Sequence, residues 1–368
     1  MAKSRLHKLS EHGVSVWFDT LSRDLVADGT LARMMDEDAV TGVTSNPTIF
    51  QKALAEGDAY DEQLKAVLEE TGDPKEIFFR LALDDIRAAC DVLRPVWDEG
   101  NGLKGYVSME VDPSLAYDTE ATFDQAMWIA EEVDRPNLYV KIPATMLGLP
   151  AIEDCIARGV SINVTLIFGL DRYRAVVEAY LRGLERLVAS GKDPEGVASV
   201  ASFFVSRVDT EADKRLEALG NTRLQGKLAI ANAKLAYQHF LEAFSGARWE
   251  FLAGKGASKQ WCLWASTSTK NPEYRDTIYV EDLIAPETVN TMPLETIEAF
   301  QDHGEVRGDT ALEGVEDART LLDELRDAAV DYDDVVETLE AEGVQKFADS
   351  FDELLAGIRA KQGALAAA

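Results

Sequence analysis

The sequence Leu138-Tyr-Val-Lys-Ile-Pro-Ala-Thr145 places one lysine, Lys141, inside a short apolar run that a proline closes. Its β-branched and aromatic residues, followed by a turn at Gly148 and Pro150, are typical of a buried strand that leads into a loop. Burial disfavours the charged ammonium, so it lowers the pKa of a lysine and frees the amine to attack a carbonyl carbon. Lys141 is therefore a candidate Schiff-base nucleophile, although a strand-end lysine taken alone is more often structural, reaching solvent or an ion pair.

Short apolar or β-branched runs alternate along the chain with longer segments of helical spacing. This alternation predicts repeated βα units around a parallel sheet. The predicted strands are residues 15–19, 42–45, 106–111, 138–142, 161–166, 197–204, 260–265 and a weaker one at 277–280. Eight strands are what a (β/α)8 barrel needs, so we expect an α/β protein with the TIM barrel fold and additional helices.

The predicted helices include residues 170–190, closed by Gly191, and residues 210–244, interrupted near Gly220 and closed by Gly246. No segment has the composition of a clean linker. We therefore expect a single domain over residues 1–368. Its barrel core covers about residues 15–293, and an acidic helical extension covers about residues 294–368. The simplest interpretation of that extension is a solvated helical surface.

Composition excludes several classes of function. Lys and Arg number 37 against 66 Asp and Glu, and the net charge of −29 argues against nucleic acid or anionic membranes as partners. No apolar stretch is long enough to span a bilayer, and no hydrophobic segment follows the basic residues 3–8, so we expect a cytoplasmic protein without a secretory signal. Three scattered cysteines and four histidines predict neither a disulfide framework nor a zinc site.

Polar residues stand at the ends of the predicted strands, where a barrel gathers its chemistry. Glu110 interrupts an otherwise hydrophobic run, and Asn163 and Thr165 alternate in their strand, so they share one face. A buried carboxylate costs several kcal/mol unless it is paired, and a neighbouring Lys141 would supply the partner. The strand-end candidates are Asp19, Asn46, Glu110, Lys141, Asn163, Thr165, Ser202, Arg207, Ser266 and Lys270.

Two of these candidates have structural alternatives of about equal weight. Asn46 precedes Pro47 and is a good turn residue, and Asp19 with Thr20 would serve as the N-cap of a helix.

Six blocks, in order along the chain, resemble transaldolases. They are Val16-Trp-Phe-Asp-Thr20, Gly42-Val-Thr-Ser-Asn-Pro47, Ser108-Met-Glu-Val-Asp112, Val140-Lys-Ile-Pro-Ala-Thr145, Ile162-Asn-Val-Thr-Leu-Ile-Phe168 and Ser202-Phe-Phe-Val-Ser-Arg207. The resemblance covers about residues 15–293. It implies an α/β barrel transferase of the pentose phosphate pathway that needs no metal or organic cofactor. It also implies transfer of a dihydroxyacetone unit from sedoheptulose 7-phosphate to glyceraldehyde 3-phosphate, giving erythrose 4-phosphate and fructose 6-phosphate.

The resemblance implies four catalytic residues. Lys141 would form the Schiff base with the ketose, and Asp19 would take the proton from the C4 hydroxyl during cleavage and later return it. Glu110 with Thr165 would hold a water that shuttles protons during imine formation, and a raised pKa would suit that carboxyl.

Other matching positions imply substrate contacts. Asn46 and Asn163 would bind hydroxyls of the retained three-carbon unit, while Arg207, aided by Ser202, would bind the sugar phosphate. Many transaldolases have an arginine in an A-S-F-R-N context after strand seven, whereas this chain has Ala265-Ser-Thr-Ser-Thr-Lys-Asn271. Three residues of this segment are therefore alternative candidates for the phosphate contact: Ser266, Ser268 and Lys270.

Two other functions remain open at this point. A class I fructose 6-phosphate aldolase would share the fold and the lysine but release free dihydroxyacetone. Related aldolases tend to carry a tyrosine near Phe204, so the phenylalanine favours transfer. A non-catalytic sugar-phosphate-binding barrel would have no need of Lys141 or Asp19. The sequence is compatible with a monomer or a homodimer.

Overall fold

Eight short strands close into one parallel barrel in this computed structural model, which describes residues 4–55 and 58–366. Each strand pairs with its neighbours in chain order, and β1 pairs with β8 to complete the ring. The strands are β1 (Val14–Phe18), β2 (Val40–Thr44), β3 (Tyr106–Glu110), β4 (Leu138–Pro143), β5 (Ile162–Ile167), β6 (Ser199–Phe204), β7 (Gln260–Ala265) and β8 (Thr288–Met292). The predicted (β/α)8 barrel is confirmed.

Seven of the eight predicted strands are confirmed to within two residues at each end, and residues 260–265 match β7 at both ends. The eighth prediction, residues 277–280, is wrong. That segment forms the single helical turn α13 (Ile278–Glu281), in which the Thr277 hydroxyl donates to the Glu281 carboxylate at 2.8 Å.

The eighth strand, β8, was not predicted because three of its residues are polar. Thr288, Asn290 and Thr291 are each at most 3% exposed, because neighbouring groups satisfy their side chains. The Thr288 hydroxyl donates to the Ala285 carbonyl at 2.7 Å, and the Asn290 amide donates to the Tyr279 carbonyl at 3.3 Å. These partners exist only once the chain has folded.

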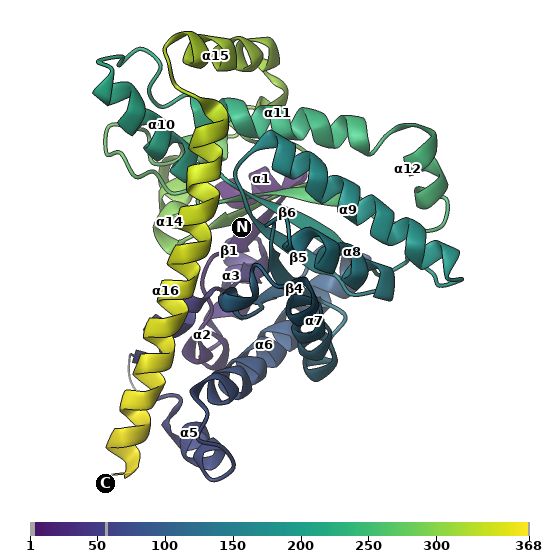
Figure 1. Ribbon diagram of the computed structural model, residues 1–368, viewed down its shortest axis with the longest axis vertical. Helices are drawn as coiled ribbons and strands as arrows, with labels where there is room; N and C mark the ends of the chain where they lie inside the picture. The colour runs from purple at the N-terminus through teal and green to yellow at the C-terminus, as the bar shows by residue number, and fades with distance from the viewer. Residues whose placement is uncertain (1–3, 56–57, 367–368) are drawn as a thin grey trace.

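Helices surround the barrel (Figure 1). The predicted helix over residues 170–190 is confirmed as α9, followed by Gly191 in the left-handed conformation, with φ of 82°. The predicted interruption of segment 210–244 near Gly220 is confirmed, because residues 219–227 separate two helices, but Gly246 begins α12 instead of closing a helix. The helices from α1 to α14 are α1 (Arg5–Glu11), α2 (Arg23–Ala27), α3 (Thr30–Glu37), α4 (Pro47–Ala55), α5 (Asp61–Leu68), α6 (Pro74–Glu99), α7 (Thr119–Val133), α8 (Gly148–Arg158), α9 (Leu170–Ala189), α10 (Ser206–Ala218), α11 (Leu228–Ala243), α12 (Gly246–Ala253), α13, given above, and α14 (Leu294–His303).

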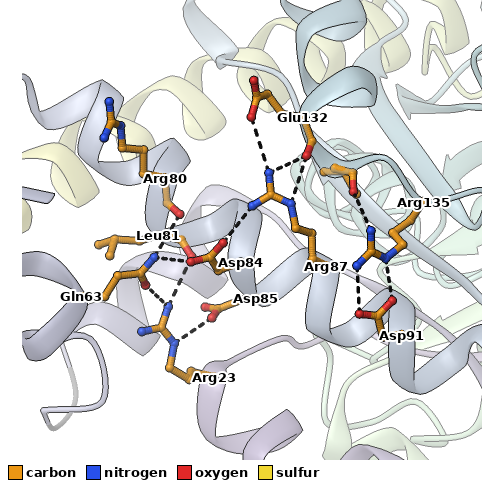
Figure 2. A network of polar contacts seen from close by, with 11 residues as sticks. Arg23, Gln63, Arg80, Leu81, Asp84, Asp85, Arg87, Asp91, Glu132 and Arg135 are labelled. Carbon is orange, nitrogen blue, oxygen red and sulfur yellow. Dashed lines mark hydrogen bonds and ion pairs between the residues drawn. The ribbon is translucent and has the colours of Figure 1, made fainter. Parts of the chain in front are cut away.

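Ion pairs connect α6 to the elements around it (Figure 2). Asp85 is 3% exposed and accepts from the Arg23 guanidinium at 2.8 Å and from the Tyr60 hydroxyl at 2.7 Å. Farther along α6, Asp91 accepts from Arg135, just beyond α7, at 2.6 Å. These contacts fix α6, and through it the loops on its side of the barrel.

The C-terminal region is helical, as predicted. Helix α14 packs against α1 and β8, and α15 (Val315–Asp327) and α16 (Tyr332–Ala366) follow it. Figure 1 shows α16, in yellow, running along the molecule from the side of α10 toward α5, and it contacts α4, α6, α10 and β5. Two short 3-10 turns, Pro113–Leu115 and Thr310–Leu312, complete the elements. Among the residues that the structure describes, no helix is both long and apolar enough to cross a membrane.

Candidate active site

The carboxyl ends of the strands surround a cavity of about 280 Å³. Parallel strands in a barrel bring their carboxyl ends to the same face, so residues distant in the sequence meet there. Of the ten predicted site residues, eight line this cavity: Asp19, Asn46, Lys141, Thr165, Ser202, Arg207, Ser266 and Lys270. The other two, Glu110 and Asn163, are buried against residues of this wall.

Lys141 is buried near the end of β4, with 5% of its surface exposed. Its Nζ lies 3.3 Å from Glu110 Oε2, and the two residues face each other across the β3–β4 pair. The aromatic ring of Phe347, from α16, lies 5.4 Å from the same Nζ. The lysine therefore has one carboxylate partner and one apolar neighbour, at a position open to the cavity.

Glu110 has an unusual environment for a carboxyl group. Burial raises its pKa to about 7, and the adjacent Lys141 ammonium opposes that rise. Its second oxygen, Oε1, is buried without a hydrogen-bond partner among the described residues, and so is Oγ1 of Thr165. Buried polar atoms are normally satisfied by protein or water, so both atoms can accept a bound water or a substrate group.

Asp19 follows β1 and is held by a threonine from the next strand. The Thr44 hydroxyl donates to Asp19 Oδ1 at 2.5 Å and lies 2.8 Å from the Thr291 hydroxyl of β8. Burial raises the pKa of the Asp19 carboxyl, while Thr44, Lys141 and Arg207 lower it. Thr44 and Thr291 also line the cavity, but neither was predicted as a site residue.

Asparagine and serine side chains form hydrogen bonds in the cavity lining and behind it. Asn163 is fully buried, donates to Ser108 Oγ at 3.0 Å and accepts from Ser202 Oγ at 2.6 Å, so it lies beneath the cavity lining. Asn46 accepts from the Ile49 amide at 3.1 Å at the start of α4. Its predicted turn role and its position on the cavity are therefore compatible.

Two residues, one beside and one in the cavity lining, adopt a left-handed backbone conformation. Leu166 has a φ of 59° at a register shift in β5, directly after Thr165, and Ser266 has a φ of 57° directly after β7. A left-handed conformation costs free energy in residues other than glycine and is found preferentially at functional sites. Ser266 Oγ lies 3.0 Å from Ser206 Oγ at the beginning of α10.

The lining also contains basic residues besides Lys141. Arg207 packs over the Phe204 ring at 4.9 Å, and burial lowers the pKa of its guanidinium against the opposing effect of Asp19. Lys270 donates to Ser268 Oγ at 2.7 Å. All three residues left open after strand seven, Ser266, Ser268 and Lys270, line the cavity.

Helix α16 contributes two cavity residues that sequence reasoning missed, Lys346 and Phe347. The C-terminal region was interpreted as a solvated surface, yet Phe347 is buried. One signal was available in the sequence, because Lys346 is the only basic residue between Asp331 and Glu353, a stretch with nine acidic residues. Glu295, from α14, is the other unpredicted charged residue of the lining.

Comparison with known proteins agrees with this geometry. The family model for transaldolase/fructose-6-phosphate aldolase matches residues 16–358. A relative named transaldolase from Parafrankia sp. (strain EAN1pec) is 54% identical over 364 residues, which cover 98% of this chain and 99% of the relative. The transaldolase of Frankia alni is 52% identical and covers 97% of each chain, and that of Thermobifida fusca is 53% identical and covers 96% of each. The chain belongs to the transaldolase/fructose-6-phosphate aldolase family.

Proposed function

We propose that this protein is a transaldolase, which transfers a dihydroxyacetone unit between ketose and aldose phosphates through a Schiff base on Lys141. The observation that carries the proposal is the buried Lys141, which faces Glu110 at 3.3 Å and opens to a cavity that Arg207 and Lys270 also line. The substrates would be sedoheptulose 7-phosphate and glyceraldehyde 3-phosphate, and the products erythrose 4-phosphate and fructose 6-phosphate. Relatives named transaldolase cover nearly the whole chain and support this assignment.

The first step joins Lys141 to the ketose. The Lys141 amine attacks the carbonyl carbon, and a proton is transferred to the carbonyl oxygen to give a carbinolamine, which loses water to form a protonated imine. Glu110, with a pKa of about 7, can accept and return a proton near neutral pH. The unpartnered oxygens of Glu110 and Thr165 support a water held by these two residues beside Lys141.

Cleavage then breaks the bond between C3 and C4 of the ketose. The electron pair of that bond moves toward the imine nitrogen and leaves an enamine, while the C4 hydroxyl proton passes to Asp19. The released aldose leaves, and an acceptor aldehyde is attacked by the enamine as Asp19 returns the proton. The raised pKa of Asp19 makes its carboxylate a better base for this exchange.

Substrate binding is assigned to polar and basic residues of the cavity lining. Asn46 and Ser202 would bind hydroxyls of the three-carbon unit, and Asn163 accepts a hydrogen bond from Ser202. Arg207 would bind the phosphate, since a guanidinium offers two parallel hydrogen bonds to phosphate oxygens. Phe204 supplies no hydroxyl at the position where a tyrosine would assist release of free dihydroxyacetone.

Borohydride trapping tests the proposal directly. Reduction of the protein in the presence of fructose 6-phosphate should fix a three-carbon adduct on Lys141, identified by peptide mass mapping. Lys141→Met should abolish both the adduct and the transfer to erythrose 4-phosphate while the protein stays folded. Lys192→Met, at an exposed position, is the matched control and should keep both. An adduct on another lysine would disprove the assigned nucleophile, and rapid release of dihydroxyacetone without an acceptor would disprove transfer as the main reaction.

A further inference from the structure

Three cations line the cavity without an ion-pair partner among the described residues. Arg207, Lys270 and Lys346 all line it, and in the part of the chain that the structure describes none of them forms an ion pair. Elsewhere, Arg248 and Arg186 each pair with two carboxylates, as expected in a chain with a net charge of −29. A group of unpaired cations in so acidic a protein indicates a binding site for an anionic ligand.

Lys346 comes from the part of the chain where acidic partners are most available. Its helix places Glu342 four residues before it and Asp349 three residues after it, both at distances that favour ion pairs along a helix. Lys346 pairs with neither, and the Gln345 amide donates to Asp349 at 2.8 Å instead. The Lys346 side chain is directed to the cavity wall.

Close packing fixes this part of α16 over the end of β5. A Cβ atom added at Gly343 would lie 3.1 Å from the Leu166 side chain and 3.3 Å from that of Phe168, so a larger residue would force these side chains to shift by a few tenths of an ångström. Arg172, from α9, makes two hydrogen bonds to Glu340 at 3.0 and 3.1 Å. Lys346 therefore projects from a helix that is held in place on the barrel.

We propose that Lys346 is a phosphate-binding residue of the active site, so that α16 supplies a third cation beside Arg207 and Lys270 for the phosphate group of the sugar substrates. This inference rests on the proposed function, because it names a further contact to the same substrates. Arg207 offers a planar fork, the two lysines offer point charges, and Ser266 and Ser268 supply hydroxyl donors.

The electrostatics of Lys270 agree with this arrangement. Burial lowers the pKa of its ammonium most, Glu295 opposes that change, and Arg207 and Lys346 lower the pKa further. Arg207 and Lys346 therefore repel Lys270, and a phosphate dianion would relieve this repulsion. The lining contains two carboxylates, Asp19 and the exposed Glu295. The three cations therefore remain in excess.

The test compares Lys346→Gln with Arg359→Gln, which removes one exposed positive charge from the same helix away from the cavity. The first measurement needs no turnover. Inorganic phosphate is added at constant ionic strength, and its dissociation constant is obtained from the shift in melting temperature. We expect Lys346→Gln to raise this constant about five- to ten-fold, Arg359→Gln to leave it within two-fold, and Lys346→Arg to restore most of the affinity.

The second measurement uses the acceptor. With saturating sedoheptulose 7-phosphate as donor and erythrose 4-phosphate release as the readout, kcat/KM is compared for glyceraldehyde 3-phosphate and for glyceraldehyde, which lacks the phosphate. Lys346→Gln should lower the first value about ten-fold and the second less than two-fold. Equal phosphate affinities in Lys346→Gln and the wild type, or equal losses with both acceptors, would overturn the inference. A wild-type protein without transfer activity would refute the proposed function instead, and the phosphate measurement would still decide the role of Lys346.

Discussion

Glu110 shows how a single residue gains its properties from its surroundings. It is buried beside Lys141, which stabilises the carboxylate, yet burial dominates and raises its pKa to about 7. One oxygen contacts the lysine, while the other has no partner among the described residues. A carboxyl poised near neutrality is suited to exchanging protons in both directions at physiological pH.

The first prediction concerns the pH dependence set by Glu110. In the proposed mechanism the ionised carboxylate accepts a proton during Schiff-base formation, so kcat/KM should fall as the pH drops below 7. Glu110→Gln should lower kcat/KM about 100-fold and remove the ionisation near pH 7 from the profile. Steady-state rates between pH 5.5 and 8.5 check this. Glu298→Gln, on the exposed surface of α14, is the control, and a Glu110→Gln profile that keeps the wild-type ionisation would exclude the role.

At the scale of an element, α6 shows that neighbouring residues of one helix can contribute very differently to stability. Asp84 and Asp85 are adjacent in Figure 2, but the Asp84 side chain is 54% exposed and that of Asp85 is 3% exposed. Asp85 alone accepts from both Arg23 and Tyr60. Breaking a buried, hydrogen-bonded ion pair costs far more than breaking an exposed one, because the remaining partner stays poorly hydrated.

The second prediction follows from this contrast. Asp85→Ala should reduce the free energy of unfolding by about 2–4 kcal/mol, since it removes the acceptor of the Tyr60 hydroxyl and of Arg23 Nε. Asp84→Ala, one residue away, should cause a much smaller loss. Denaturant unfolding followed by circular dichroism measures both. Equal losses in the two variants would contradict the importance assigned to burial.

Helix α16 changes the interpretation of the C-terminal region. Its acidic sequence predicted a solvated helical surface, and most of its charged residues are indeed exposed. Its other face packs on α4, α6, α10 and β5, and brings Lys346 and Phe347 to the cavity. The boundary predicted near residue 293 also falls just before α14, which follows β8 and packs against it. We propose that residues beyond 293 function as part of a single barrel domain.

At the scale of the whole molecule, Asp209 joins three segments near the cavity. It lies in α10 and is 2% exposed, accepting from the Ala229 amide of α11 and from the Tyr279 hydroxyl of α13, each at 2.7 Å. Burial raises the pKa of its carboxyl to about 7, although these two donors oppose the rise. The folded protein thus holds a proton on Asp209 at pH values where the unfolded chain has lost it.

The third prediction is the sign of the resulting stability change. Between about pH 4 and pH 7 the folded state binds more protons at Asp209 than the unfolded state, so this residue makes unfolding easier as the pH rises. Asp209→Asn should remove that effect, because an amide keeps a hydrogen bond to each partner without ionising. Relative to wild type, its free energy of unfolding should therefore increase by about 2–4 kcal/mol from pH 4.5 to pH 8. Asp124→Asn, at an exposed site, is the control, and parallel pH curves for Asp209→Asn and wild type would refute the prediction.

Local sequence was sufficient to predict most of the fold and much of the candidate site. Seven strands and the lysine at the end of β4 follow from short apolar runs that close on polar residues, since burial in a parallel barrel requires such runs. Eight of the ten candidate residues reach one cavity because the strands are parallel and in chain order. In such a regular topology, residues at the carboxyl ends of the strands can be expected to meet on one face of the barrel.

Only the tertiary structure determined those features that depend on contacts between residues far apart in the sequence. Strand β8 was misplaced because Thr288 and Asn290 look like loop residues until the carbonyl groups that satisfy them are in place. Asn163 lies under the cavity lining because Ser108 and Ser202 bind its amide, and Lys346 reaches the cavity because α16 packs on β5 at Gly343. Hydrophobic periodicity is a local property of the sequence, whereas hydrogen-bond satisfaction and close packing between distant segments exist only in the folded chain.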